Sequence, residues 1–250
     1  MSPLSNNAAC LLLPGRAILR QGADLREARQ GEAWEGALAS LQALLRERRP
    51  RGGVRVALSH HFAALHLVAP PPVRLGAEEM EGWLRERLGQ DYGAEAAGWR
   101  IAWQDVPPGG PVPVASLAAE HHAALAECLG ETAPRQISPW GVLAWQRHHR
   151  ALGRGEAWLA LAETGRLALL RVAGGRPTHI GMSRLAEAPS GLAGQLADAV
   201  ARQALHAGLQ APGEVWLLAP ELAADASLPG ATLRVRPLGA GGAGWGGLLP

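Results

Sequence analysis

Three predicted strands separated by two glycine turns, in the second half of the sequence, limit the possible folds more than any other feature. Thr164-Gly165 and Gly174-Gly175 are typical of the tight turns that join antiparallel strands. An amphipathic helix is predicted from Leu192 to Ala204, and the apolar run from Val215 to Leu218 is typical of a strand buried on both faces. The strands predicted in this half are residues 157–162, 167–172, 178–183, 215–218 and 232–236. This order of elements predicts an α/β unit with a mixed sheet.

The first half of the sequence contains more elements. Hairpins are predicted at two places, and their strands are residues 8–13 with 16–20 and 54–58 with 62–68. The first hairpin turns at Pro14-Gly15 and the second near His60-His61, whereas residues 107–113 are expected to form a loop. Helices are predicted over residues 34–49, about 80–88, 117–129 and 140–152, with short strands at 99–103 and 135–137.

A short internal match relates the two halves. The segment from Gly15 to Arg20 resembles the segment from Gly165 to Arg171, and each follows an apolar strand across a tight turn. The order of elements in the second half is that of an RNase-H-like unit, which actin-like proteins use twice. The sequence therefore predicts an α/β, actin-like fold of two RNase-H-like halves, with mixed sheets flanked by helices. The expected parts are a first half over residues 1–152, a second half over 153–238 and a glycine-rich flexible tail over 239–250.

Composition excludes several classes of function. The 24 basic residues are all arginine, so a Walker-type loop or a lysine-dependent enzyme is excluded. The formal net charge of +2 is small and the charges are interspersed, which argues against a surface for nucleic acid or anionic lipid. Cys10 and Cys128 form no CxxC pair and are expected to be buried thiols of a reduced, cytoplasmic protein. No apolar stretch approaches the roughly 20 residues that span a bilayer, and residues 1–14 lack the basic start of a signal peptide.

Three histidine pairs raise the question of a metal site, and they are His60-His61, His121-His122 and His148-His149. Adjacent residues on a helix or strand point in different directions, and no HExxH motif accompanies the pairs. We expect no metal site. Ser59 and His60 are likewise neighbours without a GxSxG elbow, so a hydrolase receives little support.

Four segments share a pattern with a known group of proteins. They are Val54 to Phe62, Tyr92-Gly93 with Gly98-Trp99, Ile137-Ser138-Pro139, and Glu156 to Gly165. In these segments the chain resembles the PilM and GspL group, the cytoplasmic actin-like proteins of type IV pilus and type II secretion platforms. The likeness covers most of the chain, about Ala8 to Arg236, as a pattern without a single diagnostic motif.

The resemblance implies where a nucleotide would bind. In the actin superfamily an Asp-x-Gly turn in each half holds the metal and phosphates of ATP, and a Gly-Gly pair after a late buried strand admits the adenosine. The first turn here, Leu13-Pro14-Gly15, lacks a carboxylate, and Ala219-Pro220 replaces the Gly-Gly pair. The second turn, Glu163-Thr164-Gly165, carries the longer Glu in place of Asp. We interpret Gly15, Glu163, Thr164 and Gly165 as vestigial phosphate turns, and expect neither bound Mg²⁺-ATP nor catalysis.

Tryptophan is unusually frequent, with nine residues against one Tyr and one Phe. Most of them fall on predicted core faces. Trp140 and Trp145 lie on one predicted helix and are candidates for a partner-binding surface, although core packing is favoured over an interface for both. Trp245 lies in the tail, which is a candidate docking segment that orders on binding.

The expected function is a non-catalytic, actin-like scaffold in the cytoplasm, held at the inner membrane through a partner rather than by direct insertion. The resemblance implies a partner protein, the cytoplasmic segment of a bitopic inner-membrane protein, and no nucleic acid. Two alternatives stay open. One is an ATPase or phosphotransferase that uses Glu163 and the backbone of Gly15 and Gly165 around Mg²⁺-ATP. The other is a protein-binding module unrelated to pili.

Overall fold

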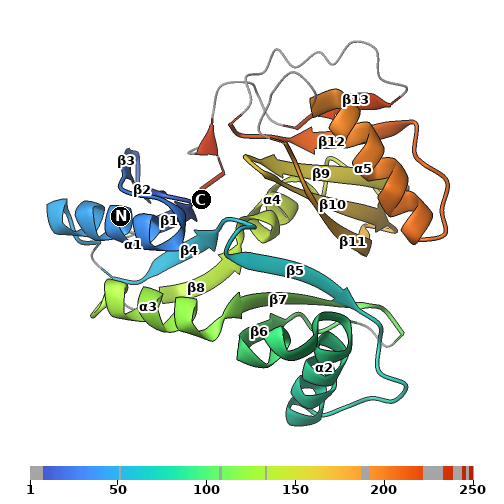
Figure 1. Cartoon of the computed structure of the whole chain (residues 1–250), viewed down its shortest axis with the longest axis horizontal. Helices are drawn as coiled ribbons and strands as arrows, with labels where there is room; N and C mark the ends of the chain where they lie inside the picture. The colour runs from blue at the N-terminus through green and yellow to red at the C-terminus, as the bar shows by residue number, and fades with distance from the viewer. Residues whose placement is uncertain are drawn as a thin grey trace, which may run out of the picture.

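The computed structural model describes residues 8–50, 52–106, 109–132, 134–186, 192–221, 233–238, 244–245 and 248–249. Within them, two five-stranded mixed sheets lie on either side of helix α4 (Trp140–His148), and a smaller sheet lies to one side (Figure 1). The first sheet has the order β3-β2-β1-β4-β8. Its strands are β1 (Ala8–Leu13), β2 (Arg16–Gln21), β3 (Asp24–Arg29), β4 (Val54–Leu58) and β8 (Pro134–Pro139). The second sheet has the order β11-β10-β9-β12-β13. Its strands are β9 (Ala157–Glu163), β10 (Arg166–Ala173), β11 (Arg176–Arg184), β12 (Glu214–Leu218) and β13 (Arg234–Pro237).

The two sheets have the same topology. In each, the first three strands run antiparallel and the last two are added parallel to the first. Helix α1 (Ala33–Glu47) joins the meander to the fourth strand in the first half, and α5 (Leu192–His206) does so in the second. The predicted duplicated, actin-like fold is therefore confirmed. No helix in the described part of the chain is long and apolar enough to cross a membrane.

Strand β1 lies at the centre of the first sheet and is buried along its whole length. Alternate side chains point to opposite faces of a sheet, so Cys10 and Leu12 pack with the α1 side of the core. Leu11 and Leu13 point to the other face, where they pack in one apolar cluster with Trp140 of α4 and with residues of β9 and β10. One continuous core therefore joins the two halves.

The first half carries an insertion between β4 and β8. Strand β5 (Ala63–Val68), α2 (Ala77–Tyr92), the 3₁₀ helix η1 (Gly93–Gly98), β6 (Trp99–Trp103), β7 (Val112–Ala118) and α3 (Ala119–Leu129) form it, and its sheet has the order β5-β7-β6. The predicted hairpin of residues 54–58 and 62–68 is wrong, because β1 and β8 occupy both edges of β4 and β5 pairs with β7 instead. The expected loop at 107–113 is wrong at its end, where β7 already begins.

Candidate functional site at the junction of the two halves

The first turn is closed by its own neighbours. Gly15 has φ +66°, its N–H donates to the carbonyl of Ala33 (2.9 Å), and its carbonyl accepts from the N–H of Gln30 (3.0 Å) and the hydroxyl of Ser40 (3.2 Å). A Cβ at Gly15 would lie 2.5 Å from the carbonyl oxygen of Gly31. Glycine is thus required here by the turn and by the close approach of the segment that begins α1.

The second turn points its carboxylate into the protein. Glu163 ends β9 and is only 5% exposed. Its Oε1 accepts a hydrogen bond from the backbone N–H of His60 (2.7 Å), which follows β4 in the first half. The Ser59 hydroxyl and the Trp140 indole lie toward the same carboxylate. Glu163 therefore ties the second half to the loop after β4.

Burial sets the charge states of this pair. It raises the pKa of Glu163 to about 7. Hydrogen bonds from Ser59 and from the backbone of His60 lower this pKa, but burial has the larger effect. Burial lowers the pKa of His60 to about 3, so this imidazole is neutral at physiological pH. The approach of His60 Nδ1 to Glu163 Oε1 at 3.8 Å is accordingly not an ion pair. It brings together a neutral imidazole and a carboxyl group that is protonated in part of the molecules at neutral pH.

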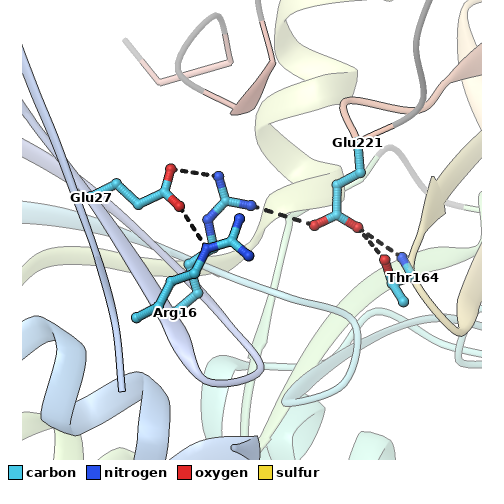
Figure 2. Close-up of polar contacts among 5 residues, drawn as sticks. Arg16, Glu27, Thr164 and Glu221 are labelled. Atoms are coloured by element: carbon cyan, nitrogen blue, oxygen red, sulfur yellow. Dashed lines mark hydrogen bonds and ion pairs between the residues drawn. The ribbon is translucent and has the colours of Figure 1, made fainter. Parts of the chain in front are cut away.

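A second carboxylate, that of Glu221, accepts hydrogen bonds from the polar groups of the second turn. Its Oε2 accepts from the backbone N–H (3.0 Å) and the hydroxyl (2.5 Å) of Thr164. Its Oε1 lies 3.6 Å from the guanidinium of Arg16, which also pairs with Glu27 at 2.6 Å. Figure 2 shows Arg16 between the two carboxylates, reaching from β2 to the segment that follows β12. Arg16 and Glu221 thus bridge the halves directly.

Glu221 remains ionised in this setting. Burial by itself raises the pKa of Glu221, but the two bonds from Thr164, the nearby indole of Trp245 and the charge of Arg16 bring it below its usual value. The indole N–H of Trp245 contributes by proximity and makes no hydrogen bond of good geometry. In a phosphate turn the backbone N–H groups bind the nucleotide. Here the N–H of Thr164 is already bonded to the anionic carboxylate of Glu221.

The glycine of the second turn is held from the first half. Gly165 has φ +77°, and a Cβ there would lie 3.5 Å from the ring of His61. The Nε2–H of His61 donates to the carbonyl of Thr164 (2.8 Å). Both members of the pair His60-His61 thus contact the second turn. In the residues placed by the structure, no three His, Cys, Asp or Glu side chains gather as a metal site would require.

The tryptophan candidates are mostly not at the surface. Trp140 is 1% exposed, because it begins α4 between the two sheets and stacks on His60 with ring centroids 5.0 Å apart. Trp245 is 3% exposed and meets Trp140 edge to face at 5.0 Å. Core packing, the favoured interpretation for Trp140, is therefore confirmed. The candidate surface role of Trp140 and Trp245, and an unpacked tail at Trp245, are corrected. Trp145 is half-buried beside His149, and its role in partner binding stays a prediction.

Sequence reasoning placed Gly15, Glu163, Thr164 and Gly165 at the two turns, and the structure brings the turns to the same junction. It missed Arg16, His60, His61 and Glu221, which make the contacts between the halves. The sequence offered one signal for Glu221, which directly follows Ala219-Pro220. A carboxylate beside the expected nucleotide pocket repels the phosphates of a nucleotide.

No family model and no curated protein matches the chain. Among solved structures, the chain is similar to the PilM-PilN type IV pilus biogenesis complex, with 15% identity, coverage of 94% of this chain and 89% of that chain, and a TM-score of 0.67. It is similar to the cytoplasmic domain of EpsL, an inner membrane component of the type II secretion system of Vibrio cholerae, with 17% identity, 93% and 90% coverage and a TM-score of 0.56. A Bacteroides thetaiotaomicron protein with an actin-like ATPase fold and unknown function gives 9% identity, 93% and 90% coverage and a TM-score of 0.58. The chain therefore has the actin-like fold of the PilM and EpsL structures, as its sequence resemblance predicted.

Proposed function

We propose that this chain is a non-catalytic, actin-like scaffold of a pilus- or secretion-type platform on the cytoplasmic side of the inner membrane. The observation that carries the proposal is the state of the second turn, whose N–H is bonded to Glu221 while the Glu163 carboxylate faces His60. A nucleotide would have to displace Glu221 from the N–H of Thr164. Its metal would find the Glu163 carboxylate already bonded to the N–H of His60. The first turn adds no carboxylate, because its sequence is Leu13-Pro14-Gly15.

Titration of Mg²⁺-ATP into the purified chain, followed by calorimetry, is expected to show no saturable binding in the micromolar range. Loss of several charge-assisted contacts, each contributing about 1.5–3 kcal/mol, removes the affinity that such binding needs. Saturable micromolar binding that disappears in Glu163→Ala would contradict the proposal and support the ATPase alternative. Titration with Mg²⁺ alone serves as the control for heats of metal binding.

The place proposed for a partner segment is a groove between the insertion and the first sheet. It has a volume of about 370 Å³ and is lined by β6, β7 and β8, with Ala102, His122 and Gln136 among its residues. Both β6 and β8 are outermost strands of their sheets, so each has an edge that pairs with no other strand described in the structure. An extended segment binds such an edge through main-chain hydrogen bonds.

The charge of the groove indicates the chemistry of the segment. Arg100 and Arg135 line it together with His122, and no acidic residue is among its lining residues. An extended segment with apolar side chains at alternate positions and at least one acidic residue fits this lining. We propose that the segment belongs to the cytoplasmic part of a bitopic inner-membrane protein.

The groove is tested by Ala102→Trp, which places a large side chain at an exposed position of β6 and leaves the core unchanged. The probes are labelled peptides made from the cytoplasmic segments of any bitopic membrane proteins that the neighbouring genes encode, and their binding is measured by fluorescence anisotropy; the lack of any such gene would count against this partner. We expect affinity to fall about tenfold or more, a change of about 1.4 kcal/mol. The matched control is Ala201→Trp at an exposed position of α5. Equal affinity for both variants would refute the groove, and no binding by the unmodified chain would refute this partner.

A further inference from the structure

Described residues that follow β13 contact both halves of the chain. Leu238 still belongs to the second half, since its N–H donates to the carbonyl of Leu217 in β12 (2.7 Å). Trp245 and Leu249 are 3% and 1% exposed, and they pack in the apolar cluster that contains Leu11 of β1 and Trp140. Figure 1 shows this end of the chain beside β1 and β2. We call Trp245, Leu248 and Leu249 the strap.

The strap contacts polar groups of both halves. Toward the second half, the Trp245 indole lies beside the carboxylate of Glu221 and helps to lower its pKa. Toward the first half, the guanidinium of Arg20 in β2 donates to the carbonyl oxygen of Leu249 (2.7 Å). Trp245 also meets Trp140 edge to face, and Trp140 in turn stacks on His60 of the first half.

Polar contacts also cross the junction, beside the apolar cluster to which Trp245 and Leu249 belong. Arg16 and Glu221 lie 3.6 Å apart with side chains 17% and 26% exposed, a geometry in which solvent weakens an ion pair. The hydrogen bond from the N–H of His60 goes to Glu163, whose carboxyl group has a pKa raised to about 7. Tryptophan buries more apolar area than other side chains, and aromatic pairs add to that burial. Trp245 therefore adds to the junction an apolar contact that depends on neither solvent exposure nor protonation.

We propose that the strap is an intramolecular ligand of the junction. It holds the two halves together by binding between Glu221, Trp140 and Arg20, and its release lets the halves separate. The inference concerns how the halves are coupled, and it does not depend on which partner the chain binds.

The test is a distance measurement between the halves by double electron–electron resonance. Spin labels are attached at Gln42→Cys on α1 and Arg202→Cys on α5, both exposed positions, while native Cys10 and Cys128 are buried. The strap predicts one narrow distance distribution for the labelled chain. Trp245→Ala is expected to add a longer-distance population, and Trp245→Phe, which keeps an aromatic ring, is expected to add less of it.

The control separates loss of the strap from general loss of stability. Trp158→Ala removes a buried tryptophan (5% exposed) from the core beneath α5 and is expected to leave the distance distribution narrow. Circular dichroism checks that each variant keeps its helices and strands. If folded Trp245→Ala retains the single narrow distance, the proposal is overturned. If Trp245→Ala loses its fold, Leu249→Ala is judged by the same criterion.

Discussion

Replacing Gly36 with alanine is expected to lower the free energy of unfolding by about 3 kcal/mol. Gly36 is buried in α1, where a Cβ would lie 2.7 Å from the carbonyl carbon of Gly31 and 2.9 Å from the Cα of Gly15, and would also contact the carbonyl oxygen of Gln30. All three are backbone atoms, so no side chain can rotate away. The first turn and α1 would have to separate. Urea denaturation followed by circular dichroism measures the loss.

Gly82→Ala is the matched control, because Gly82 also lies within a helix, α2, and a Cβ there meets no atom within 4 Å. Alanine is preferred to glycine in a helix interior by about 1 kcal/mol. The same substitution is therefore expected to stabilise at Gly82 and to destabilise at Gly36. Equal effects at the two positions would contradict the packing of Gly15 against α1, and would return Gly15 to consideration as a glycine kept for a ligand.

Glu163→Gln is expected to make the chain more stable than the unmodified protein at pH 8, by about 2–3 kcal/mol. Folding raises the pKa of Glu163 from 4.5 to about 7 through burial, so the folded state binds a proton more tightly than the unfolded state. The stability that this proton adds to the folded state is fully present below pH 4.5 and is lost as the pH rises through about 7. Glutamine keeps an oxygen to accept from the N–H of His60 and carries no charge.

The measurement is thermal or urea unfolding of both proteins from pH 5 to pH 8.5. His60 acts in the opposite direction, since burial lowers its pKa and its contribution is lost as the pH falls, but it is common to both proteins and cancels in the difference. Glu95→Gln, at an exposed position of η1, is the control and is expected to follow the unmodified chain. Parallel pH profiles for Glu163→Gln and the unmodified protein would show that the carboxylate is not buried as described.

The outcome at Glu163 also bears on the function. A carboxylate that holds a metal is stabilised in its charged form, whereas this one is kept partly protonated by its surroundings. Parallel profiles from pH 5 to pH 8.5, with a Glu163-dependent loss of stability only below about pH 5, would indicate a charged Glu163 and revive the ATPase alternative. The pH titration and the ATP titration thus examine the same carboxylate by independent readouts.

Much of the fold could be predicted because its signals are local. The apolar strands β9 and β10, the helical spacing of α5 and the turns at Gly15 and Gly165 each depend on residues that are neighbours in the chain. Local signals also placed the two turns at Gly15 and Gly165. They failed at β3, whose segment from Asp24 to Arg29 is charged and largely exposed on a sheet edge and so shows no apolar alternation.

Only the tertiary structure decided what the site residues contact. Glu163 ends a predictable strand, but its bond to His60 depends on a residue 103 positions away. Glu221 and Arg16 meet across the junction although each looks, in the sequence, like a solvated charge. Trp140 and Trp245 are large apolar residues in either setting, and the sheets and α4 decide that both are buried. Periodicity and turn chemistry determine elements because they act within one stretch of chain, whereas the direction and partner of a side chain depend on which distant elements pack beside it.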